Sequence, residues 1–226
     1  MTTLYQSDVG AIKRIVLKHP KDAFVSDEVI GREWERLNYM GPPDFIRSVE
    51  EYDRFIDLLK KFKLDLHFLP NDKSVGLDSI YTRDASIVCK KGMILCHMGK
   101  AERYTEPAAQ KTKFRTMGIP IHGTITGNGR VEGGDVVWVD EHTLLIGRGY
   151  RTNDEGIHQL KKLLGECVEE LIVVPLPHWR GPSEAFHLMS ILSLIDHGLA
   201  LVYSPLMSVP FREALLARDI ELIEVP

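Results

Sequence analysis

The stretch GNGRVEGGDVVWV, residues 127–139, places two acids and two adjacent glycines directly before a run of apolar residues. Glycines in such a loop at first suggest phosphate binding, but that motif needs a preceding strand and a following helix. Here Gly133 and Gly134 lead into VVWV, which has the character of a strand. The stretch therefore predicts two carboxylates, Glu132 and Asp135, at the head of a strand rather than a nucleotide site.

Similar strand openings occur on both sides of this one. Apolar hairpins open at Asp84, Asp135 and His187, with spacings of 135 − 84 = 51 and 187 − 135 = 52 residues. A helical stretch and a further strand follow each hairpin, so that each unit is ββαβ. Periods of 20–50 residues indicate repeats, propellers or arrays. If the repeats form a ring, their opening residues point at a common centre.

The remaining elements follow from apolar periodicity. Expected hairpins span 84–98, 135–147 and 187–203, expected helices span 42–62, 106–117, 153–168 and 209–218, and expected strands span 11–18, 64–70, 119–125, 170–177 and 220–226. We therefore expect a single α/β propeller domain over residues 1–226. It would contain a partial first blade at 10–70 and full blades at 78–125, 130–177 and 184–226.

Composition limits the partners that the chain can have. The 28 basic and 32 acidic residues nearly balance, so we expect neither nucleic acid nor an anionic membrane as a partner. The most apolar stretch, 187–206, contains two histidines and an aspartate and is not expected to span a membrane. With no secretory signal and three cysteines without metal or redox spacing, a cytoplasmic protein with reduced thiols is expected.

Two arginines are spaced like the acids. Arg103 follows Asp84 by 19 residues, and Arg151 follows Glu132 by 19. Taken singly, both could be surface arginines after hairpins. The joint spacing instead predicts that each repeat edge offers one acid and one arginine.

The acids and His187 also have ordinary structural interpretations. Asp84 could accept backbone amides at a strand start, Asp135 could cap the glycine turn, and His187 could be an interior histidine. Together with the arginines, however, they suit a ligand that carries both a cation and an anion. A guanidinium pairs with carboxylates, and a carboxylate pairs with arginine. Arginine and N-substituted arginines carry both groups, although a binding protein would show the same pattern.

Four segments in this order resemble the guanidino-modifying enzymes, a superfamily of dimethylargininases, arginine deiminases and amidinotransferases. They are YTRDASIV (81–88), EGGDVVWV (132–139), GRGYRTNDEG (147–156) and HLMSI (187–191). The resemblance runs from about residue 10 to the end of the chain. It implies a pentein, an α/β propeller with pseudo-five-fold symmetry, whose fifth blade is expected to be incomplete in this sequence.

The resemblance also implies a reaction. In the family a cysteine attacks the guanidinium carbon, and a histidine protonates the departing amine and then activates water. His187 resembles that histidine, Asp84 resembles the carboxylate that grips the guanidinium, and Glu132 resembles its partner from the next blade. These three are the expected catalytic residues, and no cofactor is implied.

Further residues resemble the substrate-binding set. Arg103 and Arg151 resemble the clamp on the substrate α-carboxylate, and Asp78 and Tyr81 match positions that line the pocket. Asp135 is counted with this set and is expected to support the turn behind it. Residues 21–42 are expected to form a mobile lid.

Two departures from the family pattern affect this prediction. None of Cys89, Cys96 and Cys167 fits the nucleophile, which is expected beyond residue 226, so the 226-residue chain is expected to be inactive alone. Met189 stands where deiminases and amidinotransferases have an aspartate, which favours the dimethylargininase-like branch.

Several alternatives stay open. They are an arginine deiminase, an arginine dihydrolase or an amidinotransferase of the same superfamily, and a non-catalytic propeller such as the ribosome anti-association factor. The expected substrate is arginine or methylarginine, and a homodimer is left open. No metal site is expected, since no histidine pair has ligand spacing with a third donor nearby.

Overall fold

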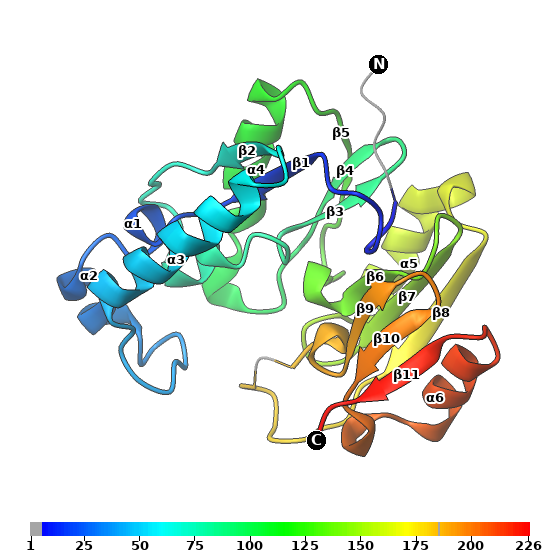
Figure 1. Cartoon of the computed structure of the whole chain (residues 1–226). Coiled ribbons are helices and arrows are strands. Elements are labelled where there is room, and N and C mark those ends of the chain that lie inside the picture. The colour runs from blue at the N-terminus through cyan, green and yellow to red at the C-terminus, as the bar shows by residue number, and fades with distance from the viewer. Residues whose placement is uncertain (1–5, 185) are drawn as a thin grey trace.

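The computed structural model describes residues 6–184 and 186–226. The described strands form four small sheets (Figure 1). The first sheet pairs β1 (Arg14–Leu17) in parallel with β2 (Asp65–Phe68). Three helices connect these strands: α1 (Pro20–Ala23), α2 (Asp27–Glu33) and α3 (Phe45–Lys60).

Three units then repeat the order strand, strand, helix, strand. They are β3 (Ser86–Cys89), β4 (Gly92–Leu95), α4 (Glu106–Thr116) and β5 (Ile121–Thr124); β6 (Val136–Trp138), β7 (Thr143–Arg148), α5 (Asp154–Leu164) and β8 (Glu170–Pro175); and β9 (Leu192–Asp196), β10 (Leu199–Val202), α6 (Val209–Leu216) and β11 (Glu221–Glu224). In each unit the middle strand pairs antiparallel with the strand before it and parallel with the strand after the helix. Among the described residues, the β1–β2 sheet has no antiparallel neighbour.

The middle strands are buried along their whole length. Every residue of β4 is buried, and so is all of β7 except Arg148, which accounts for their continuous apolar sequences. Helix α5 instead buries one face, through Ile157, Leu160 and Leu164. This helix begins where the Asn153 side chain accepts a hydrogen bond from the Gly156 amide.

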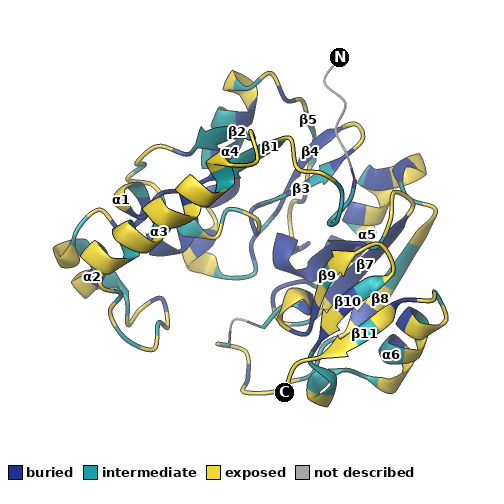
Figure 2. Cartoon of the chain, viewed as in Figure 1, coloured by how far each residue is buried: buried dark blue, intermediate teal, exposed yellow. Residues whose placement is uncertain are grey.

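The main cores lie between neighbouring units. One cluster combines residues of the first two full units, including Ile94 and Met98 from one and Leu144 and Leu160 from the other. A second cluster joins β7 and β8 to the third unit through Leu145, among others. Figure 2 shows this concentration of buried residues around β6 and β7 and the mostly exposed surface of α3. Each unit is thus completed by the next, as in repeat proteins.

The buried side chain of Gln6 links two of these units. Its amide nitrogen donates to the carbonyls of Glu141 (3.0 Å) and Cys167 (2.7 Å), and its amide oxygen accepts from the Lys90 amide (2.7 Å). The hairpin turns of the first and second full units are therefore joined through one residue of the N-terminal segment.

Residues 21–42, expected as a lid, contain α2 and the end of α1. Ser26 accepts from the Val29 amide at the start of α2. Phe24, Ile30 and Leu37 form a separate apolar cluster with Leu77. Their mobility stays a prediction. Within the described part of the chain, no helix is both long and apolar enough to cross a membrane.

Candidate active site

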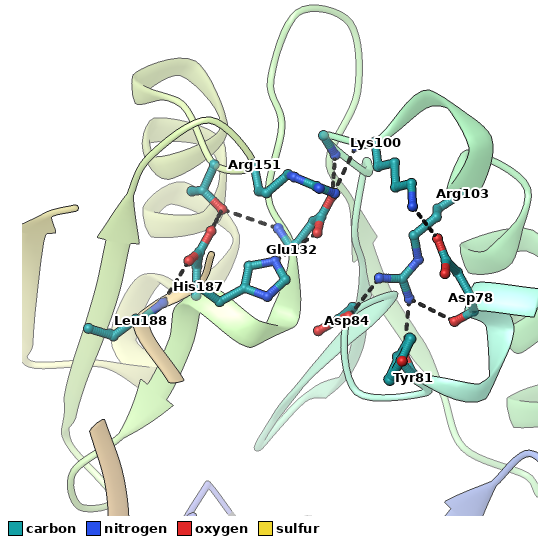
Figure 3. A network of polar contacts seen from close by, with 12 residues as sticks. Asp78, Tyr81, Asp84, Lys100, Arg103, Glu132, Arg151, His187 and Leu188 are labelled. Carbon is teal, nitrogen blue, oxygen red and sulfur yellow. Dashed lines mark hydrogen bonds and ion pairs between the residues drawn. The ribbon is translucent and has the colours of Figure 1, made fainter. Parts of the chain in front are cut away.

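Three polar residues from the heads of successive units meet at one point (Figure 3). Asp84 precedes β3, Glu132 precedes the 3₁₀ turn Gly133–Asp135 before β6, and His187 precedes the 3₁₀ turn Leu188–Ser190 before β9. One side-chain ligand atom of each lies within 4.8 Å of those of the other two. These residues are separated by about 50 positions in sequence, so the repeat brings them together.

Glu132 is fully buried and is held by four groups. Its Oε1 accepts from the backbone amides of Gly99 (2.8 Å) and Lys100 (3.0 Å), and its Oε2 lies 2.8 Å from His187 Nε2. Arg151 Nη1 lies 3.6 Å from Oε1. Burial alone would raise the Glu132 pKa, but the hydrogen bond to His187 and the charges of His187 and Arg151 hold that pKa at about 2. Glu132 is therefore an anion.

The ionised state of Glu132 determines which nitrogen of the neutral His187 ring carries the hydrogen. An ionised carboxylate only accepts hydrogen bonds, so His187 Nε2 must carry the hydrogen, which leaves Nδ1 to exchange a proton with a ligand. Burial lowers the pKa of His187, but the hydrogen bond to Glu132 and the charges of Asp135 and Asp84 outweigh it and leave the pKa raised. The imidazole is 14% exposed, enough for contact with a small molecule.

Asp84 is held on one side only. Its Oδ2 accepts from Arg103 Nη1 at 2.6 Å. Among the described residues, its Oδ1 accepts no hydrogen bond. A Cβ placed on Gly134 would lie 2.9 Å from this Oδ1 and 2.6 Å from His187 Nδ1. Asp84 Oδ1 and His187 Nδ1 therefore both lie beside the same glycine, where a cationic ligand can meet both.

Arg103 has partners other than those expected. Besides Asp84, its guanidinium binds both oxygens of Glu106 (2.9 and 2.8 Å) and the Tyr81 carbonyl (3.1 Å). The side chain is 4% exposed, so the interpretation as a surface arginine is wrong, because buried acids surround it. Its role as a carboxylate clamp stays a prediction. In this structure its donors are occupied and it positions Asp84.

Arg151 is also buried, at 7% side-chain exposure, so the surface interpretation is wrong for it as well. Its contacts are longer than those of Arg103. Nη1 lies 3.6 Å from Glu132, and Nη2 donates to the Glu184 carbonyl at 3.5 Å. Such weak partners leave guanidinium donors available to an anionic ligand.

In Figure 3, Asp78 lies on the side of Arg103 opposite Asp84, and Tyr81 lies below the Arg103 guanidinium. Asp78 is buried and its Oδ2 accepts from Lys100 Nζ at 2.7 Å, whereas Tyr81 is 53% exposed. Lys100 Nζ also donates to the Leu37 carbonyl at 2.7 Å. Lys100 thus connects Asp78, the segment after α2 and, through its amide, Glu132.

Asp135, counted among the substrate-binding residues, is fully buried behind the site. Its Oδ2 accepts from the Thr152 hydroxyl (2.6 Å) and its Oδ1 from the Leu188 amide (3.0 Å). These contacts hold the turn that carries His187, and the place of Asp135 among the substrate-binding residues stays a prediction. Burial raises the Asp135 pKa to about 6.

Sequence reasoning did not identify four residues that contact the candidate site: Gly134, Lys100, Glu106 and Thr152. Lys100, Glu106 and Thr152 form hydrogen bonds and ion pairs that no local sequence pattern predicts. Gly134 did carry a signal, since two adjacent glycines before a strand are unusual. Adjacent glycines are typical of positions where other groups approach the backbone closely, as His187 and Asp84 approach Gly134 here.

None of the three cysteines has the surroundings of a nucleophile. Cys89, Cys96 and Cys167 are all buried. Cys96 lies nearest the acids, and burial, followed by the charges of Glu132 and Asp84, raises its pKa well above the ordinary value. A thiol with a raised pKa is a poor nucleophile.

Asp84, Glu132 and His187 form a group that could hold a metal ion, since an imidazole and two carboxylates are common metal ligands. His187 Nε2 is already bonded to Glu132 Oε2, so a metal would have to replace this contact or bind elsewhere on the two side chains. The absence of a metal stays a prediction.

Comparison with known proteins agrees with the repeat architecture. An N(G),N(G)-dimethylarginine dimethylaminohydrolase of Streptomyces coelicolor is 24% identical over 199 residues, which cover 88% of this chain and 71% of that protein. The enzyme of the same name from Pseudomonas aeruginosa is 25% identical over 189 residues, covering 84% and 69%. The solved N-terminal domain of ArgZ, a cyanobacterial arginine dihydrolase bound to product, superposes with a TM-score of 0.76 at 19% identity, covering 96% of this chain and 76% of that one.

The fold is therefore the expected α/β propeller of ββαβ repeats. Residues 77–219, more than half of the chain, match the arginine deiminase family model. The chain belongs to the arginine deiminase family, within the guanidino-modifying superfamily.

Proposed function

We propose that this chain provides the guanidinium-binding and proton-transfer groups of an amidine hydrolase that converts N-methylated arginine or arginine to citrulline. One observation carries the proposal: His187 Nε2 is bonded to Glu132 Oε2 at 2.8 Å while Asp84 presents a free oxygen beside Nδ1. A buried acid–imidazole pair of this kind is suited to general acid–base work on a cation.

Asp84, Arg151 and His187 have distinct roles in this reaction. Asp84 Oδ1 accepts N–H groups of the substrate guanidinium, and Arg151 pairs with the substrate carboxylate. A cysteine thiolate, which these 226 residues do not supply in a reactive form, attacks the guanidinium carbon. His187 gives a proton to the departing amine as the C–N bond breaks. It then takes a proton from water, which adds to the same carbon and displaces the thiolate to give citrulline.

The position of Met189 favours a methylated substrate. Its sulfur accepts from Arg83 Nε at 2.8 Å, and the side chain is 36% exposed. A methionine side chain does not offer the carboxylate acceptors of an aspartate, so an N-methyl group, which removes a donor, loses less than it would beside an aspartate.

A turnover assay tests the proposed reaction, and a binding assay tests the proposed binding site. Protein purified from its natural source should release citrulline from N(G),N(G)-dimethylarginine or arginine, and the ratio of the two kcat/KM values identifies the branch. For the 226-residue chain, calorimetric titration with both ligands should give binding. Asp84→Asn should weaken that binding roughly 10- to 150-fold, since a hydrogen bond to a charged group contributes about 1.5–3 kcal/mol.

Glu166→Gln is the control, because it also replaces a carboxylate by an amide. Glu166 is exposed and lies in the turn after α5, not among the residues of the candidate site. This substitution should leave affinity unchanged. Absence of heat with every ligand, together with absence of citrulline, would favour the non-catalytic propeller. Size-exclusion chromatography of the same sample tests the homodimer, which we retain as a proposal along with a cytoplasmic setting.

A further inference from the structure

A cavity of about 360 Å³ lies apart from the candidate active site, between the residues after β1 and β2 and one face of α4. None of Asp84, Glu132 and His187 lines it. Its polar lining includes four residues that are each at least nine-tenths buried: Lys18, Ser79, Glu106 and Gln110. The volume falls within the range typical of small-molecule sites, which is roughly 300–1,000 Å³.

Two of these groups are donors with too few partners. The Lys18 amine contacts the Pro70 carbonyl, and it forms no ion pair within residues 6–184 and 186–226. An ammonium group can make three hydrogen bonds. Burial lowers the pKa of Lys18, against the opposing charges of Asp22 and Asp72. The Ser79 hydroxyl is buried without any hydrogen-bond partner. Both groups lose free energy by burial unless an acceptor reaches them.

Most acceptors in the cavity wall are already occupied, and within residues 6–184 and 186–226 the exception among the carboxylates is Asp72 Oδ2, which accepts no hydrogen bond. Both carboxylate oxygens of Glu106 bind Arg103. The Gln110 oxygen accepts from the Ser86 hydroxyl at 2.7 Å, and Asp72 Oδ1 accepts from Ser74. The cavity therefore offers unused donors and few unused acceptors, so an acceptor ligand fits it best.

We propose that this cavity binds a small organic monocarboxylate with an apolar tail, whose carboxylate accepts hydrogen bonds from Lys18 and Ser79. Phe68, Leu69 and Val75 supply an apolar wall for the tail. A monoanion is favoured over a phosphate dianion, because Asp72 and Glu106 lie in the same lining and would repel a second charge. This inference does not depend on the proposed function.

Hexanoate is a suitable probe, with hexan-1-ol and hexylamine as controls of equal chain length. Calorimetric titration should show binding of hexanoate, weaker binding of the alcohol and none of the amine. Ser79→Ala should weaken hexanoate roughly tenfold or more, since it removes a hydrogen bond to a charged group. This variant should fold normally, because the hydroxyl that it removes has no partner. Ala109→Leu, which fills the cavity from α4, should abolish binding.

A carboxylate could also bind at the candidate active site, so the titration is repeated with Arg151→Gln. Unchanged hexanoate affinity in that variant, with loss in Ala109→Leu, supports the cavity. Loss in Arg151→Gln with no effect of Ser79→Ala or Ala109→Leu would overturn the proposal. Equal affinity for hexanoate and hexylamine, or no binding of hexanoate at millimolar concentration, would overturn it as well. Thermal unfolding of each variant checks that it is folded.

Discussion

Replacing Gly134 with alanine tests the geometry of the site by adding a single methyl group. Gly134 lies in the 3₁₀ turn Gly133–Asp135 and is not among the glycines with positive φ, so alanine can adopt its backbone conformation. The added Cβ would lie 2.6 Å from His187 Nδ1, 2.8 Å from His187 Cγ and 2.9 Å from Asp84 Oδ1. The effect should therefore arise from side-chain displacement and not from backbone strain.

The size of the displacement follows from these distances. An ordinary carbon contact begins at 3.4 Å, so the imidazole must move by about 3.4 − 2.6 = 0.8 Å to restore one. Such a movement disrupts the hydrogen bond of 2.8 Å between His187 Nε2 and Glu132 Oε2. Loss of a hydrogen bond to a charged group costs about 1.5–3 kcal/mol, and a misplacement of about 1 Å costs roughly 100-fold in catalysis.

Three measurements read out this variant. Titration of His187 by NMR should give a pKa lower than in the wild type, because the Glu132 contact raises it. Ligand affinity should fall at least tenfold, and urea unfolding should show the loss of about 1.5–3 kcal/mol. Gly31→Ala is the control: a Cβ on this residue of α2 meets nothing within 4 Å, so it should stabilise slightly. Wild-type His187 pKa and affinity in Gly134→Ala would refute the reasoning.

Four further outcomes are expected. Glu132→Gln should lower the His187 pKa and weaken arginine binding, which NMR and calorimetry measure; an unchanged pKa would mean that the pair does not form in solution. Burial raises the Asp135 pKa from 3.8 to about 6, so the folded state holds this proton more tightly than the unfolded state and loses stability as pH rises through that window. The free energy of unfolding of Asp135→Asn, relative to that of the wild type, should therefore rise by up to about 3 kcal/mol between pH 4 and 6. This figure is the pKa difference of about 2.2 units multiplied by 1.36 kcal/mol per unit. If urea unfolding shows a difference between the two proteins that does not change with pH, the prediction is wrong. EDTA should leave arginine affinity unchanged, whereas a loss restored by a divalent ion would reveal a metal at the acid–histidine cluster. The three buried cysteines should resist a thiol reagent until the protein unfolds, and rapid labelling of Cys96 in the native state would contradict its raised pKa.

The repeated units could be predicted from sequence because burial is periodic within them. The hairpin around Lys90–Gly92, the helix at 153–168 and the strand at 170–177 all appear, the helix with a shorter end. Helix α5 ends at Leu164 because Gly165 adopts a positive φ, after which a 3₁₀ turn follows. Short helices such as α1 have too few residues for a periodic signal.

The site could be predicted less completely. Its three central residues followed from the period and the resemblance, since each lies at the head of a unit. The partners of Arg103 could not be predicted in this way, because its pairing with Glu106 depends on how α4 packs against the strands and not on a local sequence pattern. Asp135 illustrates the same limit, since the sequence predicted its place behind the turn but not its pairing with the Thr152 hydroxyl and the Leu188 amide.

The position of Gln6 has a consequence for synthesis on the ribosome. Its side chain bonds to the Cys167 carbonyl, 161 residues further along the chain. At about 5–20 residues per second, roughly 8 to 32 s pass between the appearance of the two groups. During this interval the N-terminal segment has been made but cannot complete its hydrogen bonds, so it joins the second full unit only after that unit has been almost entirely translated.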